Sequence, residues 1–261
     1  HEMETMYHDA VQARLAEWLG PEGKRLASKT LRVMGLGESQ IESHIQNTMA
    51  DPAGCSMALL AVEGEVHIRL TRDAADEREA QAALQSVVKR IREALGNNIY
   101  GEGDKTLPGT VLDLLFARGY TVALAESCTG GLVSKLLTDI AGSSKAYWGG
   151  VISYSNEAKT RILGVREETL KRYGAVSPET AREMARGVRT LAGSTFGLSL
   201  TGIAGPDGGS PEKPVGLVYL GLSSPQGDMA RELRLLGSRD GIRTLAAKSS
   251  LDWLRRILEQ Q

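Results

Sequence analysis

The sequence TVALAESCTGG, residues 121–131, decides the fold of this chain. Its first five residues form an apolar run of strand length, and Gly130 and Gly131 mark the start of a helix with apolar residues at helical spacing. A strand that passes directly into a helix is typical of open α/β sheets, in which functional groups gather at the carboxyl ends of the strands. Ser127 lies at this junction, where the sequence predicts a functional site.

The segments on either side of this stretch alternate between helices and strands. Ser177 and Pro178 are a typical N-cap and first helical residue. The alternation, with two adjacent strands near its end, predicts an α/β three-layer sandwich with a mixed, mostly parallel sheet and an antiparallel edge. The expected strands are Thr121–Ala125, Val151–Tyr154, Phe196–Leu200, Val215–Leu222 and about Met229–Leu236; the expected helices are about 106–118, Leu132–Ile140, Ser177–Leu191 and a last one to Leu258.

The first hundred residues have a different order of elements. Residues 1–28 predict a helix and a polar connector, because Val11, Leu15, Trp18 and Leu19 recur at helical spacing. Residues 29–100 follow the order β-α-β-β-α, which predicts a small α+β domain. The segment Gly96–Lys105 is expected to link it to a third domain, residues 104–261. The elements expected in the small domain are strand Lys29–Val33, a helix through Ile41 and Ile45, a hairpin of Met57–Val62 and Val66–Leu70, and a helix within Ala75–Leu95.

Composition argues against several classes of protein. The 261 residues carry a formal net charge of −1 and only two phenylalanines, which does not favour a nucleic-acid or membrane partner. No apolar run is long enough to span a membrane. Cys55 and Cys128 lie in different segments and have no metal-ligand spacing. We therefore expect free thiols, a cytoplasmic location, and neither a metal nor another cofactor.

A nucleophilic serine at position 127 needs a base, and histidine, the usual base, does not occur after residue 100. The segment from Tyr154 to Lys159 offers another. If Asn156 caps the next helix, Lys159 falls near its third position, where the helix dipole and burial both favour the neutral amine. Tyr154 could then relay or orient a proton. The alternatives are that Ser127 is only a helix cap and that Lys159 is a solvated surface lysine.

Two further features belong to the same set of strand ends. The glycine-rich loop Thr201–Ser210 follows a strand, and its backbone donors suit a phosphate or a polar heterocycle, although it matches no standard phosphate-binding motif. Cys128 is the competing nucleophile, since a thiolate is intrinsically more reactive than an alcohol. With no histidine to pair with it, we expect Cys128 to be a small buried residue with at most an auxiliary role.

Four segments together resemble a known family. They are LAESCTGGLVSKLLTDIAGSS (124–144), GGVISYSNEAKTRILGV (149–165), YGAVSPETAREMARGVR (173–189) and TGIAGPDGGSPEKPVGLVYLGL (201–222). They resemble the CinA C-terminal domain, the nicotinamide mononucleotide amidohydrolase family, over residues 104–261. KTLRVMGLGESQIE (29–42) looks like the KH-like middle region of CinA proteins, and residues 1–28 look like a helical connector from a preceding domain. The small domain has no GxxG loop, so nucleic-acid binding is not expected.

The resemblance implies deamidation of nicotinamide mononucleotide to nicotinate mononucleotide and ammonia. It matches family catalytic residues to Ser127, Tyr154 and Lys159, with backbone N–H groups near Thr129–Gly131 holding the oxyanion. A homodimer is also expected, and a catalytically silent nucleotide-binding or scaffold protein remains the alternative. The residues expected to bind substrate are Cys128, Thr129, Gly130, Gly131, Thr201, Gly202, Gly205, Asp207 and Arg239.

Overall fold

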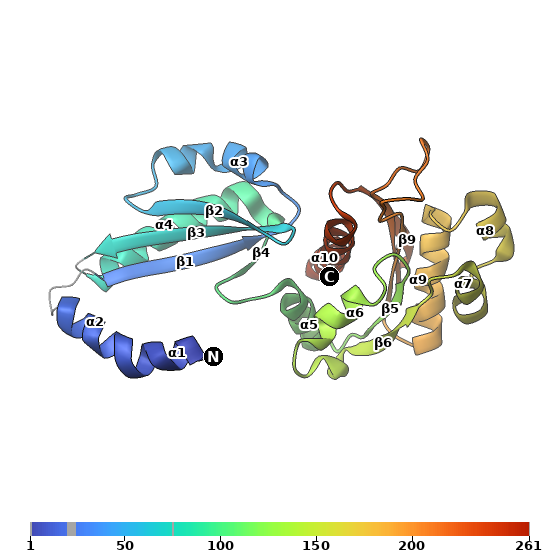
Figure 1. Cartoon of the computed structure of the whole chain (residues 1–261), viewed down its shortest axis with the longest axis horizontal. Helices are drawn as coiled ribbons and strands as arrows, with labels where there is room; N and C mark the ends of the chain where they lie inside the picture. Colours follow the sequence, from blue (N-terminus) through green and yellow to red (C-terminus); the bar gives the residue numbers. More distant parts are fainter. Residues whose placement is uncertain (1, 20–24, 75, 261) are drawn as a thin grey trace.

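The computed structural model describes residues 2–19, 25–74 and 76–260, and these form two lobes and an N-terminal helical segment (Figure 1). Each lobe is built on its own sheet, of four strands in the smaller lobe and five in the larger. The smaller lobe comprises residues 25–102 and the larger one residues 107–260. The expected α/β fold, with a small α+β unit ahead of it, is confirmed.

The smaller lobe packs two helices on one face of an antiparallel sheet with strand order β2-β3-β1-β4. Residues on alternate positions of the strands face the helices, and Leu31, Ile68 and Leu70 are fully buried there. The segment predicted as a linker instead supplies β4, which pairs with β1. The elements of the smaller lobe are β1 (Arg25–Val33), α3 (Glu38–Ala50), β2 (Ser56–Val62), β3 (Glu65–Ala74), α4 (Glu77–Leu95), a 3₁₀ turn (Gly96–Asn98) and β4 (Ile99–Glu102).

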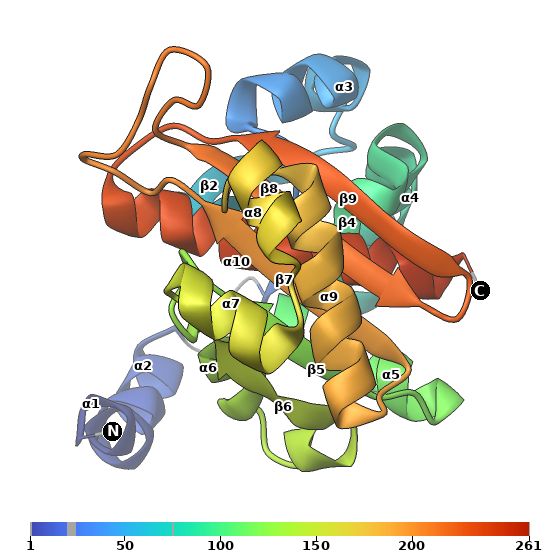
Figure 2. The same ribbon diagram turned by 90° about the vertical axis from the view of Figure 1, so that its right-hand side faces the viewer.

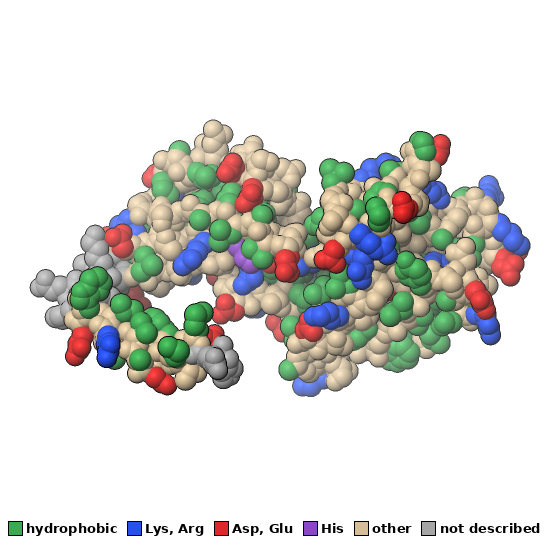
Figure 3. Space-filling view, viewed as in Figure 1, with side chains coloured by type: hydrophobic (Ala, Val, Ile, Leu, Met, Phe, Trp, Pro, Cys, Tyr) green, Lys and Arg blue, Asp and Glu red, His purple; other side chains and the backbone are tan. Residues whose placement is uncertain are grey.

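The N-terminal segment is helical, as expected, over the residues described. It runs as α1 (Glu2–Met6), a π-helical turn (Tyr7–Val11) and α2 (Gln12–Leu19). Hydrophobic side chains, including that of Trp18, are exposed along it (Figure 3). The predicted stop at residues 20–23 lies outside the described residues, and residues 25–28, expected as connector, belong to β1.

The larger lobe is a three-layer sandwich with strand order β6-β5-β7-β8-β9. β5 runs parallel to β6 and β7, and β8 runs antiparallel to β7 and β9. Helix α9, with α7 and α8, covers one face, and α5, α6 and α10 cover the other (Figure 2). The elements are α5 (Leu107–Arg118), β5 (Val122–Glu126), α6 (Leu132–Thr138), a 3₁₀ turn (Ser143–Lys145), β6 (Tyr147–Ile152), α7 (Asn156–Leu163), α8 (Glu167–Tyr173), α9 (Pro178–Ala192), β7 (Phe196–Gly202), β8 (Leu217–Ser224), β9 (Gly227–Arg234) and α10 (Arg239–Glu259).

Two local differences from the expected elements change the site. Strand β6 ends at Ile152, so Tyr154 lies in the connection to α7 and not at the end of a strand. Helix α7 is capped by Ser155, whose hydroxyl accepts from the Ala158 N–H at 3.1 Å. Asn156 is therefore the first helical residue and Lys159 the fourth, one position further in than predicted.

Helix α10 joins the two lobes. Lys248 on α10 contacts Glu65 of β3 at 3.4 Å. The guanidinium of Arg255 is fully buried and donates to the Asn97 carbonyl at 2.6 Å, and Arg256 donates to Asn98 at 2.9 Å. The first turn of the same helix supplies arginines to the candidate site, so one rigid element contacts both the smaller lobe and the site.

Candidate active site

The structure brings Ser127 and Lys159 into direct contact. Ser127 follows β5, and Lys159 extends from α7 so that its Nζ donates to the Ser127 Oγ at 3.0 Å. Nζ also donates to the carbonyls of Ser153 at 2.7 Å and Tyr154 at 3.4 Å. Both side chains are largely withdrawn from solvent, with Ser127 8% and Lys159 1% exposed. A hydroxyl held against a buried amine is the geometry that a serine nucleophile and a lysine base require.

Burial lowers the pKa of Lys159 below its ordinary value, because the ammonium form loses its hydration. Among the described residues, no carboxylate forms an ion pair with Nζ, and its partners are a hydroxyl and two carbonyls. Its position in the first turn of α7 also places the amine near the positive end of the helix dipole. Lys159 is therefore suited to accept a proton at a lower pH than an ordinary lysine.

Glu126 binds the N–H groups at the start of α6, a role that the alternative interpretation gave to Ser127. Its carboxylate, 1% exposed, accepts from the N–H groups of Gly131 at 3.0 Å, Val133 at 3.2 Å and Ser134 at 2.8 Å. Helix α6 begins at Leu132 with Gly131 as its N-cap. The interpretation of Ser127 as a helix cap is therefore wrong. The N–H groups of Gly131 and Gly130 are therefore both already hydrogen-bonded, the first to the Glu126 carboxylate and the second to the Ser127 carbonyl at 3.2 Å.

Cys128 is a poor nucleophile in this environment. Its side chain is buried, and burial raises the pKa of its thiol to about 11. The N–H groups of Cys128 and Thr129 and the charge of Lys159 lower this pKa, but less than burial raises it. Because the thiolate and not the thiol attacks, the population of the reactive form at neutral pH is very small. The environment therefore favours Ser127 over its neighbour.

A pocket of about 190 Å³ opens onto the Ser127–Lys159 pair. It contains seven of the residues predicted for the site, drawn from four separate segments of the chain. The Arg239 guanidinium, from the start of α10, donates to the Gly205 carbonyl at 2.7 Å and contacts the Tyr154 hydroxyl at 3.4 Å. The lining residues are Ser127, Cys128, Tyr154, Lys159, Ala175, Val176, Thr201, Gly202, Ala204 and Arg239.

Other residues predicted to bind substrate do not line this pocket. Thr129 is fully buried, and its hydroxyl has no hydrogen-bond partner among the described residues. Gly130 and Gly131 adopt positive φ angles, 62° and 96°, which glycine tolerates best, so they allow the backbone to form the turn. Gly205 lies behind the pocket, where its carbonyl holds Arg239, and Asp207 is exposed in the glycine-rich loop.

Sequence reasoning missed several residues that shape the site. Ala175 and Val176 form one wall, and the Thr201 hydroxyl donates to the Ala175 carbonyl at 2.7 Å. Lys213 donates to the Val176 carbonyl at 2.7 Å and so ties the glycine-rich loop to this wall. The acidic residue just before a glycine-marked helix start was a signal for Glu126 as a cap. Contacts such as that of Lys213 join distant segments and leave no local pattern.

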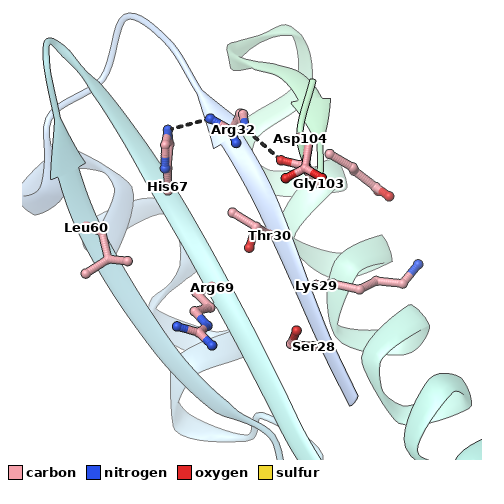
Figure 4. A pocket seen from close by; sticks show the side chains of 10 residues that line it. Ser28, Lys29, Thr30, Arg32, Leu60, His67, Arg69, Gly103 and Asp104 are labelled. Atoms are coloured by element: carbon pink, nitrogen blue, oxygen red, sulfur yellow. Dashed lines mark hydrogen bonds between the residues drawn. The ribbon is translucent and has the colours of Figure 1, made fainter. Parts of the chain in front are cut away.

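The smaller lobe has a larger hollow of about 580 Å³ on the sheet face that α3 and α4 leave uncovered (Figure 4). Arg32 in this hollow donates to the Gly103 carbonyl at 2.7 Å and contacts His67 at 3.2 Å. His67 Nε2 lies 2.6 Å from the buried carboxylate of Glu65, and no described hydroxyl of the hollow contacts it. The described residues of the hollow therefore contain no hydroxyl paired with a base, as Ser127 is paired with Lys159.

The described residues show neither a metal-binding cluster nor a membrane-spanning helix. They contain no group of three or more histidine, cysteine, aspartate or glutamate side chains placed to hold a metal ion. None of the described helices combines the length and the apolar character that crossing a bilayer requires.

Comparison with known proteins supports both lobes. The family model of the CinA C-terminal domain matches residues 104–258, and that of the damage-inducible protein CinA KH domain matches residues 28–101. The chain belongs to the CinA family. CinA-like proteins of Syntrophomonas wolfei and Kosmotoga olearia are 47% and 46% identical to it over 258 and 257 residues. These matches cover 99% and 98% of this chain but 62% of each relative, so the chain spans less than two thirds of their length.

Solved CinA structures match more than half of this chain. The competence/damage inducible protein CihA from Agrobacterium tumefaciens is 42% identical, with a TM-score of 0.57, and the match covers 59% of this chain and 94% of that one. A CinA superfamily protein from Klebsiella pneumoniae is 34% identical, with a TM-score of 0.58, over 59% of this chain and 97% of that one.

Proposed function

We propose that this CinA chain hydrolyses the carboxamide of nicotinamide mononucleotide, giving nicotinate mononucleotide and ammonia. The observation that carries this proposal is the buried contact of 3.0 Å between Lys159 Nζ and Ser127 Oγ at the bottom of a pocket. A serine activated by an amine of lowered pKa performs acyl transfer without histidine or metal. The resemblance of the surrounding motifs to nicotinamide mononucleotide amidohydrolases supplies the bond that is broken.

The proposed reaction passes through an acyl-serine ester. Lys159, in its neutral form, accepts the proton of the Ser127 hydroxyl as Oγ attacks the carboxamide carbon. The carbon–nitrogen bond then breaks, Lys159 returns the proton to the leaving nitrogen, and ammonia departs. Water enters, loses a proton to Lys159 and attacks the ester, which releases the carboxylate and regenerates the serine hydroxyl.

Two of the N–H groups first expected to hold the oxyanion, those of Gly130 and Gly131, are already engaged. The Gly131 N–H is bound to Glu126, and the Gly130 N–H to the Ser127 carbonyl. The N–H groups of Cys128 and Thr129 remain beside the nucleophile, facing the thiol of Cys128. We assign the oxyanion to these two donors, since fixed backbone N–H groups cost no reorganisation during the reaction.

The size and charge of the pocket suit part of a nucleotide. At about 190 Å³ it is smaller than the roughly 300–1,000 Å³ of sites that enclose a drug-sized ligand. We place the pyridine carboxamide inside and the ribose phosphate at the rim, where Arg239 has a hydroxyl and a carbonyl as its hydrogen-bond partners. The Tyr154 hydroxyl orients this guanidinium, and a proton relay through Tyr154 requires its side chain to turn from Arg239 toward Lys159.

Ammonia release tests the function. The chain is incubated with nicotinamide mononucleotide, with nicotinamide riboside and with nicotinamide, and both ammonia and the carboxylate product are measured. We expect equal amounts of the two products from the nucleotide and a much lower kcat/KM without the phosphate. Saturable binding of the nucleotide without product would instead identify a silent nucleotide-binding protein.

A further inference from the structure

The turn that carries Ser127 is held from two sides by charged side chains. On one side, the Glu126 carboxylate accepts from three backbone N–H groups of the first turn of α6 and from the Ser134 hydroxyl at 2.7 Å. All four bonds lie between 2.7 and 3.2 Å, and the carboxylate is withdrawn from solvent. A buried charge with this many donors is held rigidly.

On the other side, Arg243 from the first turns of α10 binds the carbonyls of the same turn. Its Nε donates to the Cys128 carbonyl at 3.3 Å and its Nη2 to the Thr129 carbonyl at 2.8 Å. The planar guanidinium fork presents both donors in a fixed geometry, which a lysine could not reproduce. Asp240, one turn earlier, lies 3.7 Å from Nη1 and is largely exposed.

Three backbone hydrogen bonds also restrain the turn. The Ser127 N–H donates to the Leu200 carbonyl at 3.0 Å, the Gly130 N–H to the Ser127 carbonyl at 3.2 Å and the Leu132 N–H to the Thr129 carbonyl at 3.3 Å. Gly130 and Gly131 have positive φ angles, and the Thr129 hydroxyl is buried without a described partner. Among the described backbone hydrogen bonds none reaches the Cys128 carbonyl, so Arg243 is its only recorded partner. The orientation of the Cys128–Thr129 peptide therefore depends on Arg243, and that peptide carries one of the two donors assigned to the oxyanion.

We propose that Glu126 and Arg243 are positioning residues that together fix the Ser127 turn. They keep Oγ against Lys159 and the Cys128 and Thr129 N–H groups directed at the oxyanion. This proposal rests on Ser127 being the nucleophile of the proposed function. Glu126 fixes the position of the N–H groups where the turn enters α6. Arg243 fixes the orientation of the Cys128 and Thr129 carbonyls. Neither side chain is among the residues that line the pocket, so both act through Ser127 and not on the substrate.

The reactivity of Ser127 toward a serine-directed fluorophosphonate tests this proposal separately from amide hydrolysis. In that reaction Oγ forms a bond to phosphorus, fluoride leaves, and Lys159 takes the hydroxyl proton. We expect Arg243→Ala to label at Ser127, and to turn over nicotinamide mononucleotide, about 10²-fold more slowly, since a displacement of about 1 Å costs that much. KM should stay within about twofold, because the substrate contacts are retained.

Added guanidinium ion should restore part of the labelling rate of Arg243→Ala, whereas Arg243→Lys should remain slow because it lacks the fork. Arg231→Ala is the matched control, since Arg231 is exposed on β9 and its side chain takes part in none of the described side-chain hydrogen bonds or ion pairs. On the other side of the turn, Glu126→Gln places an amide NH₂ group, itself a donor, against backbone N–H donors and should slow labelling. Glu167→Gln is its exposed control on α8 and should not slow labelling.

The results separate the two proposals. Slow labelling of Arg243→Ala with rescue by guanidinium supports the positioning role. If the unmodified chain releases no ammonia from the nucleotide, that result contradicts only the proposed function. Labelling of Arg243→Ala and Glu126→Gln within about twofold of the unmodified chain overturns positioning. If Arg243→Ala does not fold, Arg243→Lys decides the question, and labelling at the unmodified rate overturns the proposal in the same way.

Discussion

Replacement of Lys159 by methionine should lower kcat strongly while stabilising the fold. The ammonium is 1% exposed and has no carboxylate partner among the described residues, and burying such an ion costs several kcal/mol. Methionine has a similar length and loses three hydrogen bonds, each worth about 1 kcal/mol net. We expect a net gain in the free energy of unfolding of about 1 kcal/mol near neutral pH.

The pH dependence of this gain identifies its cause. The pKa of Lys159 is lowered in the folded chain from the ordinary 10.5 that applies when the chain unfolds. Between these two pKa values the unfolded chain holds a proton that the folded chain has lost, so its free energy of unfolding rises by up to about 1.4 kcal/mol per pH unit. Lys159→Met lacks this increase. The difference in free energy of unfolding between Lys159→Met and the unmodified chain should therefore shrink as the pH rises toward 10.5.

Urea unfolding measured from neutral to alkaline pH tests this reasoning, with Trp253 on α10 as a buried fluorescent reporter in the same lobe. The same variant should lose about 10³-fold in kcat, within the range for removal of a general base. In the unmodified chain kcat/KM should rise with pH through the lowered pKa of Lys159. A stability difference that does not change with pH, or retained turnover, contradicts the assignment of Lys159 as a buried base.

Three further predictions concern other residues. Cys128→Ala should keep a kcat of the same order, because the thiol has a pKa of about 11; kinetics of ammonia release check this. Arg239→Gln should raise KM for the nucleotide far more than for nicotinamide riboside, if its guanidinium binds the phosphate. Arg255→Met should lower the free energy of unfolding by about 3 kcal/mol, because it breaks a buried pair with Asp252, whereas the exposed Arg161→Met should change it by less than about 1 kcal/mol in urea unfolding.

The pairing of Ser127 with Lys159 could be predicted because each follows one of two parallel strands of one sheet, β5 and β6, whose carboxyl ends meet. The absence of histidine after residue 100 then left lysine as the base. Helix and strand types were predicted correctly through most of the larger lobe, since their apolar periodicity is strong. The homodimer and the cytoplasmic location stay predictions.

The parts that the sequence did not predict depend on contacts between distant segments. β4 was predicted as part of a linker because the segment Gly96–Lys105 around it is mostly polar and glycine-bearing, and its pairing with β1 makes it a strand. Arg243 reaches carbonyls more than a hundred residues earlier in the chain, a contact that no local pattern encodes. A helix cap was the alternative role for Ser127 because serine favours a helix start, and the geometry of the turn gives that role to Glu126.

Ammonia release by Ser127→Ala is the most direct test of the central claim. Alanine removes only the oxygen that Lys159 contacts at 3.0 Å and leaves Glu126, Arg243 and the pocket in place. We predict that this variant still binds nicotinamide mononucleotide but releases ammonia at least about 10³-fold more slowly than the unmodified chain. Turnover by Ser127→Ala at the rate of the unmodified chain would contradict the assignment of Ser127 as the nucleophile.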